Sequence, residues 1–293
     1  MDQAFSYTKL PSPSAVRLLK VDISCDEDVL HGTLIVTNIH ADERSKYACL
    51  SYTWGTPFLF DRNDPGDPSW WNKKSVLKLT DSSTGSSGTI LITQNLYEFL
   101  IHMNRNPPDD VENIWIDAIC INQKDFAERA IQVQLMGDIY KSCEQTIVWL
   151  GPEDQDTKDV FQIMRIASKP SESYAVGSDT FPAGPLDLKS LLRLVGLSNL
   201  SEESWGALGR LFERNWFHRV WTVQESILPE KFLFVCGNFS ADLLPIERMS
   251  YLIRFKAEQQ MNTPYLILRA STEDQPGALS KESLLATFFF TTT

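Results

Sequence analysis

Trp221 and Glu225 are the residues whose types and spacing best suit catalysis. They end the run Trp216-Phe-His-Arg-Val-Trp-Thr-Val-Gln-Glu225, and on a helix the positions i and i+4 share one face. An indole shields a neighbouring carboxylate from water. A fixed carboxylate stabilises the positive charge that develops on a sugar when a glycosidic bond breaks. Glu225 is therefore the candidate catalytic residue, and Trp221 a candidate substrate contact. The alternative is a surface glutamate, or one paired with Arg219.

Ser51, Tyr52 and Trp54 form a second candidate group, at the end of the apolar segment 47–54. In open α/β sheets, ligands bind beyond the carboxyl ends of the strands. The two aromatic rings could stack on a planar ligand, and the serine could bind a phosphate or a ribose. The alternative for the rings is core packing, which we expect for one of the two. Strand alternation places Tyr52 and Trp54 on one face and Ser51 on the other.

Asp117 is the one acid inside the apolar run 114–121. A buried carboxylate is costly unless it is paired or hydrogen-bonded. We expect Arg129 or Arg219 to be its partner. A structural ion pair, or a bond to backbone amides, is favoured over a catalytic role, but Asp117 stays a candidate ligand contact.

Arg129 and Arg219 are candidate phosphate clamps, because a guanidinium presents a planar fork of donors. The alternative is that they pair with acidic residues of the chain, namely Glu128, Asp117 or Glu225.

The run 114–121 predicts a central strand buried on both faces, because neither face has polar alternation. Asn122 and Gln123 follow it, where they could touch a ligand or cap the next helix. Asp125 and Glu128 resemble a capping box. The spacing of Ala127, Ile131, Leu135 and Ile139 then predicts the inward stripe of a helix. A strand over 146–150 completes a strand–helix–strand unit, which is typical of parallel sheets.

The remaining segments predict an α/β protein with a mainly parallel sheet flanked by helices and with inserted strands and helices. Small polar residues and glycines in 81–88 predict a flexible loop. The predicted strands are 16–21, 30–37, 47–54, 76–79, 89–92 and 231–236, and the predicted helices are 95–104, 156–168, 186–194, 202–212 and 244–259.

Composition excludes several classes of protein. The chain has 293 residues and a formal net charge of -11, which disfavours nucleic acid and anionic membranes as partners. Its five cysteines include no CxxC pair and its four histidines do not cluster, so we expect no metal site. The odd cysteine count and the lack of a signal core or membrane-length apolar run favour a cytoplasmic location.

Three blocks in this order resemble the fungal heterokaryon incompatibility (HET) domain. They are Tyr47-Ala-Cys-Leu-Ser-Tyr-Thr-Trp-Gly55, Ile114-Trp-Ile-Asp-Ala-Ile-Cys-Ile-Asn-Gln123 and Arg219-Val-Trp-Thr-Val-Gln-Glu225. Cys49 is a mild departure from the family pattern. The family's later Asp-Pro-Arg-Asp segment is absent, and the chain ends on apolar residues. We therefore expect a flexible arm over 1–14, the HET domain over 15–260, and over 261–293 the truncated end of a longer protein.

The resemblance implies a function in programmed cell death, a form of fungal innate immunity, when genetically unlike cells fuse. The family is similar in fold to the Toll/interleukin-receptor (TIR) domain, which is flavodoxin-like. Some TIR domains cleave NAD with a glutamate in a Trp-x-x-x-Glu pattern, which Trp221 and Glu225 match. The resemblance thus implies NAD hydrolysis with no cofactor other than this substrate. It also implies self-association and an upstream receptor, such as an NLR-type protein. The alternative is a non-catalytic signalling module that works by self-association.

Overall fold

The computed structural model describes residues 3–20, 24–26, 29–41, 45–58, 73–107, 111–168, 187–219, 229 and 231–261. The chain divides into two compact units. The first comprises Met1–Pro152 with Trp221–Asn238, and the second Glu153–Val220 with Phe239–Thr293. The predicted boundaries at 14 and 260 stay predictions.

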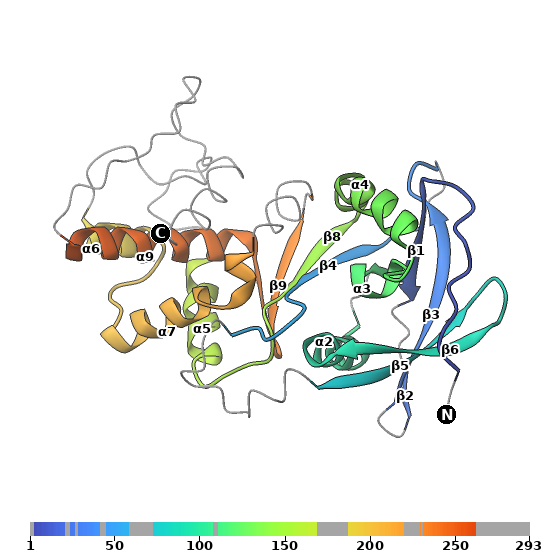
Figure 1. Cartoon of the computed structure of the whole chain (residues 1–293). Helices are drawn as coiled ribbons and strands as arrows, with labels where there is room; N and C mark the ends of the chain where they lie inside the picture. The colour runs from blue at the N-terminus through green and yellow to red at the C-terminus, as the bar shows by residue number, and fades with distance from the viewer. Residues whose placement is uncertain are drawn as a thin grey trace. The chain divides into compact units, whose positions relative to one another are not determined.

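A mixed β-sheet forms the centre of the first unit (Figure 1). Its order is β9-β8-β4-β7-β1-β3-β5-β6, and β2 pairs with β3. The strands are β1 (Ala15–Lys20), β2 (Ser24–Asp26), β3 (Val29–Asn38), β4 (Ala48–Tyr52), β5 (Lys74–Asp81), β6 (Ser87–Thr93), β7 (Asn113–Trp115), β8 (Gln145–Trp149) and β9 (Phe232–Cys236). The predicted α/β class is confirmed.

Four of these strands are parallel neighbours, in the order β7-β4-β8-β9. Along the chain β4 comes first, β7 second, β8 third and β9 fourth. Their order in the sheet is therefore 2-1-3-4, which is the flavodoxin-like order of doubly wound sheets. In such sheets the strand order reverses between the first and third strands, here β4 and β8, and ligands bind at the carboxyl ends beside that point. On the other side of β7, strand β1 runs antiparallel to both β7 and β3, so the whole sheet is mixed.

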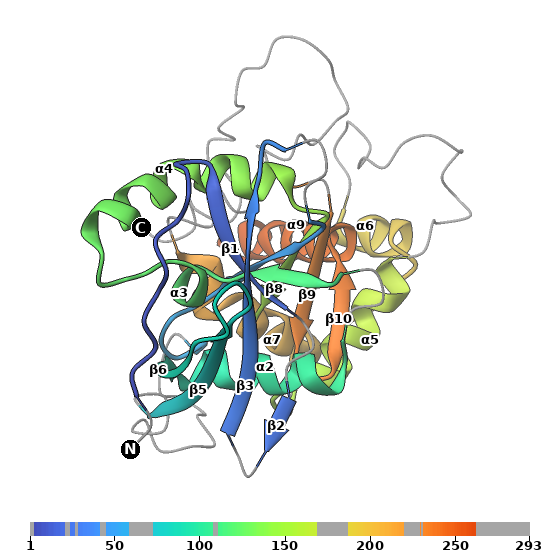
Figure 2. The same ribbon diagram turned by 90° about the vertical axis from the view of Figure 1, so that its right-hand side faces the viewer.

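Helices α2 (Gln94–Arg105) and α4 (Phe126–Ser142) cover opposite faces of this sheet (Figures 1 and 2). Strand alternation divides the core accordingly. Leu50 of β4 packs in the cluster that contains Phe99 of α2, whereas Cys49 packs in the cluster that contains Ile139 of α4. The sheet is thus buried on both faces where β4 crosses it.

The predicted strand over 114–121 is wrong in its second half. Strand β7 is central, between β1 and β4 as expected, but it ends at Trp115. The chain then turns into a short helix, α3 (Asp117–Cys120), in which the amides of Ile119 and Cys120 donate to the Ile116 carbonyl at 3.0 and 2.7 Å. Ile119 joins the cluster beside α2, and Cys120 joins the cluster beside α4. A segment with apolar neighbours on every side can be a helical turn or a strand. Its sequence is apolar at nearly every position in both cases, so the run 114–121 has no periodicity that would distinguish the two.

Helix α4 begins as predicted but faces the core differently. The Asp125 carboxylate accepts hydrogen bonds from the amides of Ala127 and Glu128 at 3.0 and 3.1 Å, as a helix N-cap does. The predicted inward stripe is wrong in its first half, because Ala127 and Ile131 are exposed, whereas Gln132 is buried. Leu135 is half-buried and Ile139 is buried. The Gln132 amide donates to the Ala15 carbonyl at 3.0 Å. That bond turns a polar position towards the sheet and leaves apolar residues outside.

The second unit is mostly helical. Its elements are α5 (Thr157–Ala167), α6 (Leu188–Leu194), α7 (Glu202–Phe212), the 3-10 helix η1 (Asn215–His218), β10 (Phe239–Asp242) and α9 (Leu243–Met261). The predicted helices over 156–168, 186–194, 202–212 and 244–259 are confirmed. Arg214 is buried and pairs with Asp154 at 2.7 Å, so an ion pair joins the end of α7 to the start of α5.

Candidate functional site

Trp54 and Asp117 meet at the carboxyl ends of two parallel strands. Strand β4 ends two residues before Trp54, and β7 ends two residues before Asp117. The Trp54 indole Nε1 donates to Asp117 Oδ2 at 3.0 Å, and Ala118 N donates to Asp117 Oδ1 at 2.7 Å. The Trp54 residue is 44% exposed. The Asp117 carboxylate is thus fixed by two hydrogen bonds beside the accessible ring of Trp54. Both residues lie at the edge where doubly wound sheets bind ligands.

Asn95 fixes the same edge from the first turn of α2. This residue is 0% exposed. Its Nδ2 donates to the Thr53 carbonyl at 2.7 Å, and its Oδ1 accepts from Trp149 Nε1 at 2.9 Å. One amide therefore joins the ends of β4 and β8. Asn95 was not among the predicted site residues. An amide among the apolar residues of a helix that directly follows a strand was the available signal.

Ser51 and Tyr52 lie inside β4 and are buried, at 1% and 2% exposure. Tyr52 packs in the core cluster beside α2, so core packing is the observed arrangement for this one of the two aromatic residues. Trp54 lies beyond the end of the strand, where alternation no longer decides its direction. The exposed ring of Trp54 is the surface that this segment offers to a ligand.

Asn122 and Gln123 hold the connection between α3 and α4. Gln123 Nε2 donates to the Asp117 carbonyl at 2.8 Å, and Asn122 Oδ1 accepts from Lys124 N at 3.2 Å. The cap of α4 is Asp125, so neither amide residue caps that helix. The bond from Gln123 fixes the backbone carbonyl of Asp117.

A buried ion pair supports this connection. Arg17 Nη1 and Nη2 donate to Glu128 Oε1 and Oε2 at 2.6 and 3.0 Å, and Asn122 N donates to Glu128 Oε1 at 2.7 Å. Glu128 therefore pairs with Arg17 and not with Arg129. Burial raises the pKa of the nearby Cys120 thiol to about 12, so this thiol stays protonated at neutral pH and is a poor nucleophile.

The remaining predicted site residues are Arg129, Arg219, Trp221 and Glu225. The Arg129 guanidinium lies 4.9 Å from the centre of the Phe126 ring on exposed α4, and makes no ion pair with Asp117. Arg219 follows η1 in the second unit and is half-buried. Trp221 and Glu225 lie outside the described residues.

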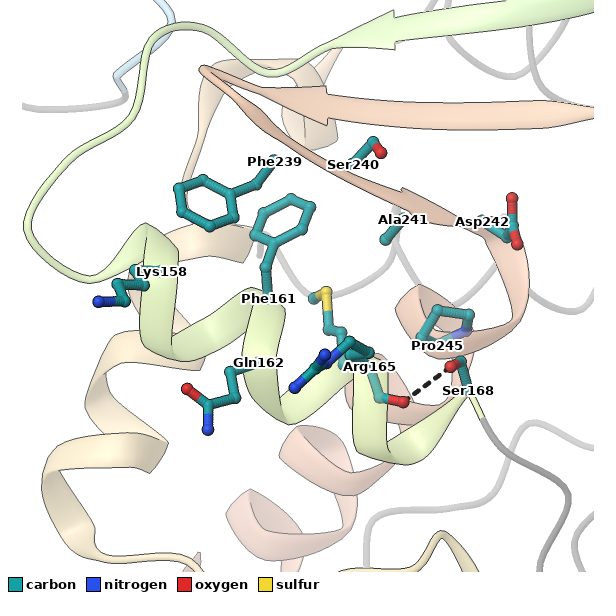
Figure 3. A pocket seen from close by; sticks show the side chains of 11 residues that line it. Lys158, Phe161, Gln162, Arg165, Ser168, Phe239, Ser240, Ala241, Asp242 and Pro245 are labelled. Carbon is teal, nitrogen blue, oxygen red and sulfur yellow. Dashed lines mark hydrogen bonds between the residues drawn. The ribbon is translucent and has the colours of Figure 1, made fainter.

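A cavity of about 390 Å³ lies in the second unit (Figure 3). Helix α5, strand β10 and the first turn of α9 line it, and it contains none of the predicted site residues. Within the described ranges, His, Cys, Asp and Glu side chains do not group in threes that could hold a metal ion. Those ranges also contain no helix that is both long and apolar enough for a membrane span.

Comparison with known proteins gives the following matches. The family model described as "Heterokaryon incompatibility protein (HET)" matches residues 47–225. The protein "Heterokaryon incompatibility protein 6, OR allele" of Neurospora crassa is 30% identical over 257 residues, which cover 80% of this chain and 35% of that protein. This chain thus spans about a third of that relative's length. No solved structure matches.

Proposed function

Because the chain belongs to the heterokaryon incompatibility (HET) family, we propose that it acts in heterokaryon incompatibility as a cell-death effector, by hydrolysing NAD to nicotinamide and ADP-ribose. Family membership supports the first part of this proposal. The hydrogen bond between Trp54 and Asp117 at the carboxyl edge of the parallel strands supports the second. The proposed substrate and the odd cysteine count favour a cytoplasmic location.

The Trp54–Asp117 pair is the observation that carries the hydrolase proposal. NAD contains two planar rings, and an exposed indole offers a face on which one of them could stack. The bond to Asp117 holds that indole in one orientation. Ser51 and Tyr52 are buried in β4, so Trp54 is the proposed ring contact of this segment. Arg129 and Arg219 stay the candidates for the pyrophosphate from the sequence alone.

The proposed reaction breaks the bond between the ribose anomeric carbon and the nicotinamide nitrogen. The electron pair of this bond passes to nicotinamide, and positive charge develops on the ribose ring. Water adds to the anomeric carbon and releases a proton. Glu225 is the proposed carboxylate that stabilises the charge, on the strength of its Trp-x-x-x-Glu spacing from Trp221.

Nicotinamide release from NAD by the purified protein at high concentration tests the proposal. We expect Glu225→Gln to fold normally, to bind NAD as the parent does and to lose about 10²- to 10³-fold in rate. Trp221→Ala should weaken packing and ligand stacking together. Trp54→Phe keeps a ring but removes the donor to Asp117, and should reduce release less than Trp54→Ala. The matched control is Glu144→Gln, which changes an exposed carboxylate of the first unit.

The three outcomes for Glu225→Gln are distinct. Loss of nicotinamide release and of cell killing in a folded protein supports the hydrolase. Killing that is retained in a folded protein excludes a catalytic role. Unfolding identifies a structural carboxylate.

The second candidate function is a non-catalytic signalling module that works by self-association. The outward side of α4 favours it, because Phe126, Ile131 and Val133 are 73%, 40% and 45% exposed. An apolar face of this kind is typical of interaction surfaces. Under this proposal the partners are further copies of the chain and an upstream receptor, such as an NLR-type protein.

A further inference from the structure

The cavity of the second unit has an apolar floor and a polar rim. Phe161, Met164 and Pro245 are buried in the floor, and Phe239 is half-buried there. The ring centroids of Phe161 and Phe239 are 5.8 Å apart and the ring planes are tilted by 41° (Figure 3). The volume of about 390 Å³ falls in the range of small-molecule sites. The floor therefore suits a planar, apolar group of small size.

The rim carries charges on two opposed walls. Lys158, Gln162 and Arg165 stand on α5, while Ser240 and Asp242 stand on β10 (Figure 3). Residues three and four apart face the same side of a helix, so the three α5 side chains form one wall. A ligand in the cavity would meet cations and an amide on one side and a carboxylate on the other.

The side-chain polar groups of the rim residues on α5 and β10 have no hydrogen-bond or ion-pair partner within the part of the chain that the structure describes. Three other arginines of this unit are engaged. Arg210 binds Asp156, Arg214 binds Asp154, and Arg248 donates to the Ala167 carbonyl. A chain with net charge -11 has many acids available for pairing. The five N–H donors of the Arg165 guanidinium nevertheless have no partner among the described residues, and they lie beside the aromatic floor of the cavity.

We propose that this cavity binds a nucleoside phosphate, with the base on the floor of Phe161 and Phe239. The phosphate binds Arg165, whose fork matches two phosphate oxygens, and Gln162 adds a donor one turn away. Lys158 adds electrostatic attraction from the next turn. Asp242 accepts hydrogen bonds from ribose hydroxyls or an amino group of the base. The inference does not depend on the proposed NAD hydrolysis, because none of these residues serves that reaction.

Calorimetric titration of the full chain with AMP tests this site. Adenosine lacks the phosphate, ribose 5-phosphate lacks the base, and inorganic phosphate lacks both base and sugar. We expect AMP to bind at least about tenfold more tightly than any of the three, because the floor and the cation contribute together. Arg165→Gln should weaken AMP binding about tenfold or more. Arg193→Gln should leave it unchanged, since Arg193 is an exposed arginine of α6 outside the cavity. Circular dichroism checks that both variants are folded.

Two further variants separate the possible results. Phe239→Leu keeps apolar volume but removes a ring, and should weaken AMP more than ribose 5-phosphate. Trp54→Ala alters the carboxyl edge of the first unit and should leave AMP binding intact. The proposal is overturned if AMP binds no better than phosphate, if Arg165→Gln binds AMP like the parent, or if only Trp54→Ala abolishes binding. These readouts do not involve nicotinamide release, so failure here and failure of the hydrolase proposal are separate results.

Discussion

A few buried polar side chains fix the carboxyl edge of the parallel strands. Asn95 joins the ends of β4 and β8, and Arg17 with Glu128 secures the segment behind Asp117. A buried polar group without a hydrogen-bond partner costs free energy. Any arrangement of the strands that breaks these bonds is therefore less stable than the observed one. Precise placement of Trp54 against Asp117 follows from that restriction.

Asn95→Ala should destabilise the protein by about 1–3 kcal/mol for each group left without a partner, namely the Thr53 carbonyl and Trp149 Nε1. The free energy of unfolding in urea measures this loss. Asn104→Ala is the control, because it makes the same change at an exposed position of the same helix. Equal stability of the two variants would mean that the Asn95 bonds do not secure the edge.

The β5–β6 hairpin shows how one residue organises an element. The segment 81–88 was predicted to be a flexible loop, and the structure shows a hydrogen-bonded turn there; its mobility stays a prediction. Asp81 accepts from Ser83 N and Ser83 Oγ at 2.8 and 2.6 Å, and from Thr8 Oγ1 at 2.6 Å. Gly85 has a φ of 70°, which favours glycine. A side chain at Gly88 would lie 2.5 Å from the Phe5 backbone. The glycines therefore serve turn geometry and close packing here.

Acid should selectively weaken this hairpin. Burial by itself raises the pKa of the Asp81 carboxyl, but the bonds from Ser83 and Thr8 outweigh that effect and hold the pKa below its ordinary value. A carboxyl whose pKa is lower in the folded state contributes stability above its unfolded pKa of about 3.9, and loses it as the pH falls through the folded pKa. Asp81→Asn should therefore be less stable than the parent at pH 7, by about 1–2 kcal/mol, and the difference should shrink below about pH 4.

Thermal unfolding of both proteins between neutral and acidic pH measures this difference. Asp159→Asn is the matched control, since Asp159 is exposed on α5. A difference between parent and Asp81→Asn that does not change with pH would show that the charge of Asp81 is not what stabilises the turn.

At the scale of the whole molecule, an acidic chain presents a helix, α4, that has several exposed apolar residues. The net charge of -11 opposes contact between copies. The exposed side chains of α4 near its start include Phe126, Ala130 and Val133, and also Arg129, whose positive charge lies over the Phe126 ring. Contact between copies over this surface would bury apolar area without placing carboxylates against each other.

Sedimentation velocity over a range of protein concentrations should show reversible self-association of the parent. Phe126→Glu should shift it towards monomer, because the change places a charge at the most exposed apolar residue of α4. Leu91→Glu on β6 is the control, since Leu91 is 70% exposed but lies on another element. A parent that stays monomeric at high concentration, or an equal response of the two variants, would exclude α4 as the contact surface.

Local patterns in the sequence were sufficient to predict the class of fold and most of its elements. They did not predict β2, α3, η1 or β10. The strands around Ala48–Tyr52 and Gln145–Trp149 and the cap at Asp125 were correct. Apolar runs, capping residues and turn residues act over a few positions, so they can be identified without knowledge of the fold. The three motif blocks placed the chain in its family for the same reason, and the family match runs from residue 47 to residue 225.

The tertiary structure alone decided which distant residues meet. Asp117 accepts a hydrogen bond from Trp54, 63 residues away, a partner that the sequence did not predict. Glu128 pairs with Arg17, 111 residues away. The order of the strands determines such contacts, and strand order depends on the packing of the whole sheet. The run 114–121 breaks after Trp115 for a related reason: a segment surrounded by apolar neighbours has no periodicity, so packing selects between strand and helix.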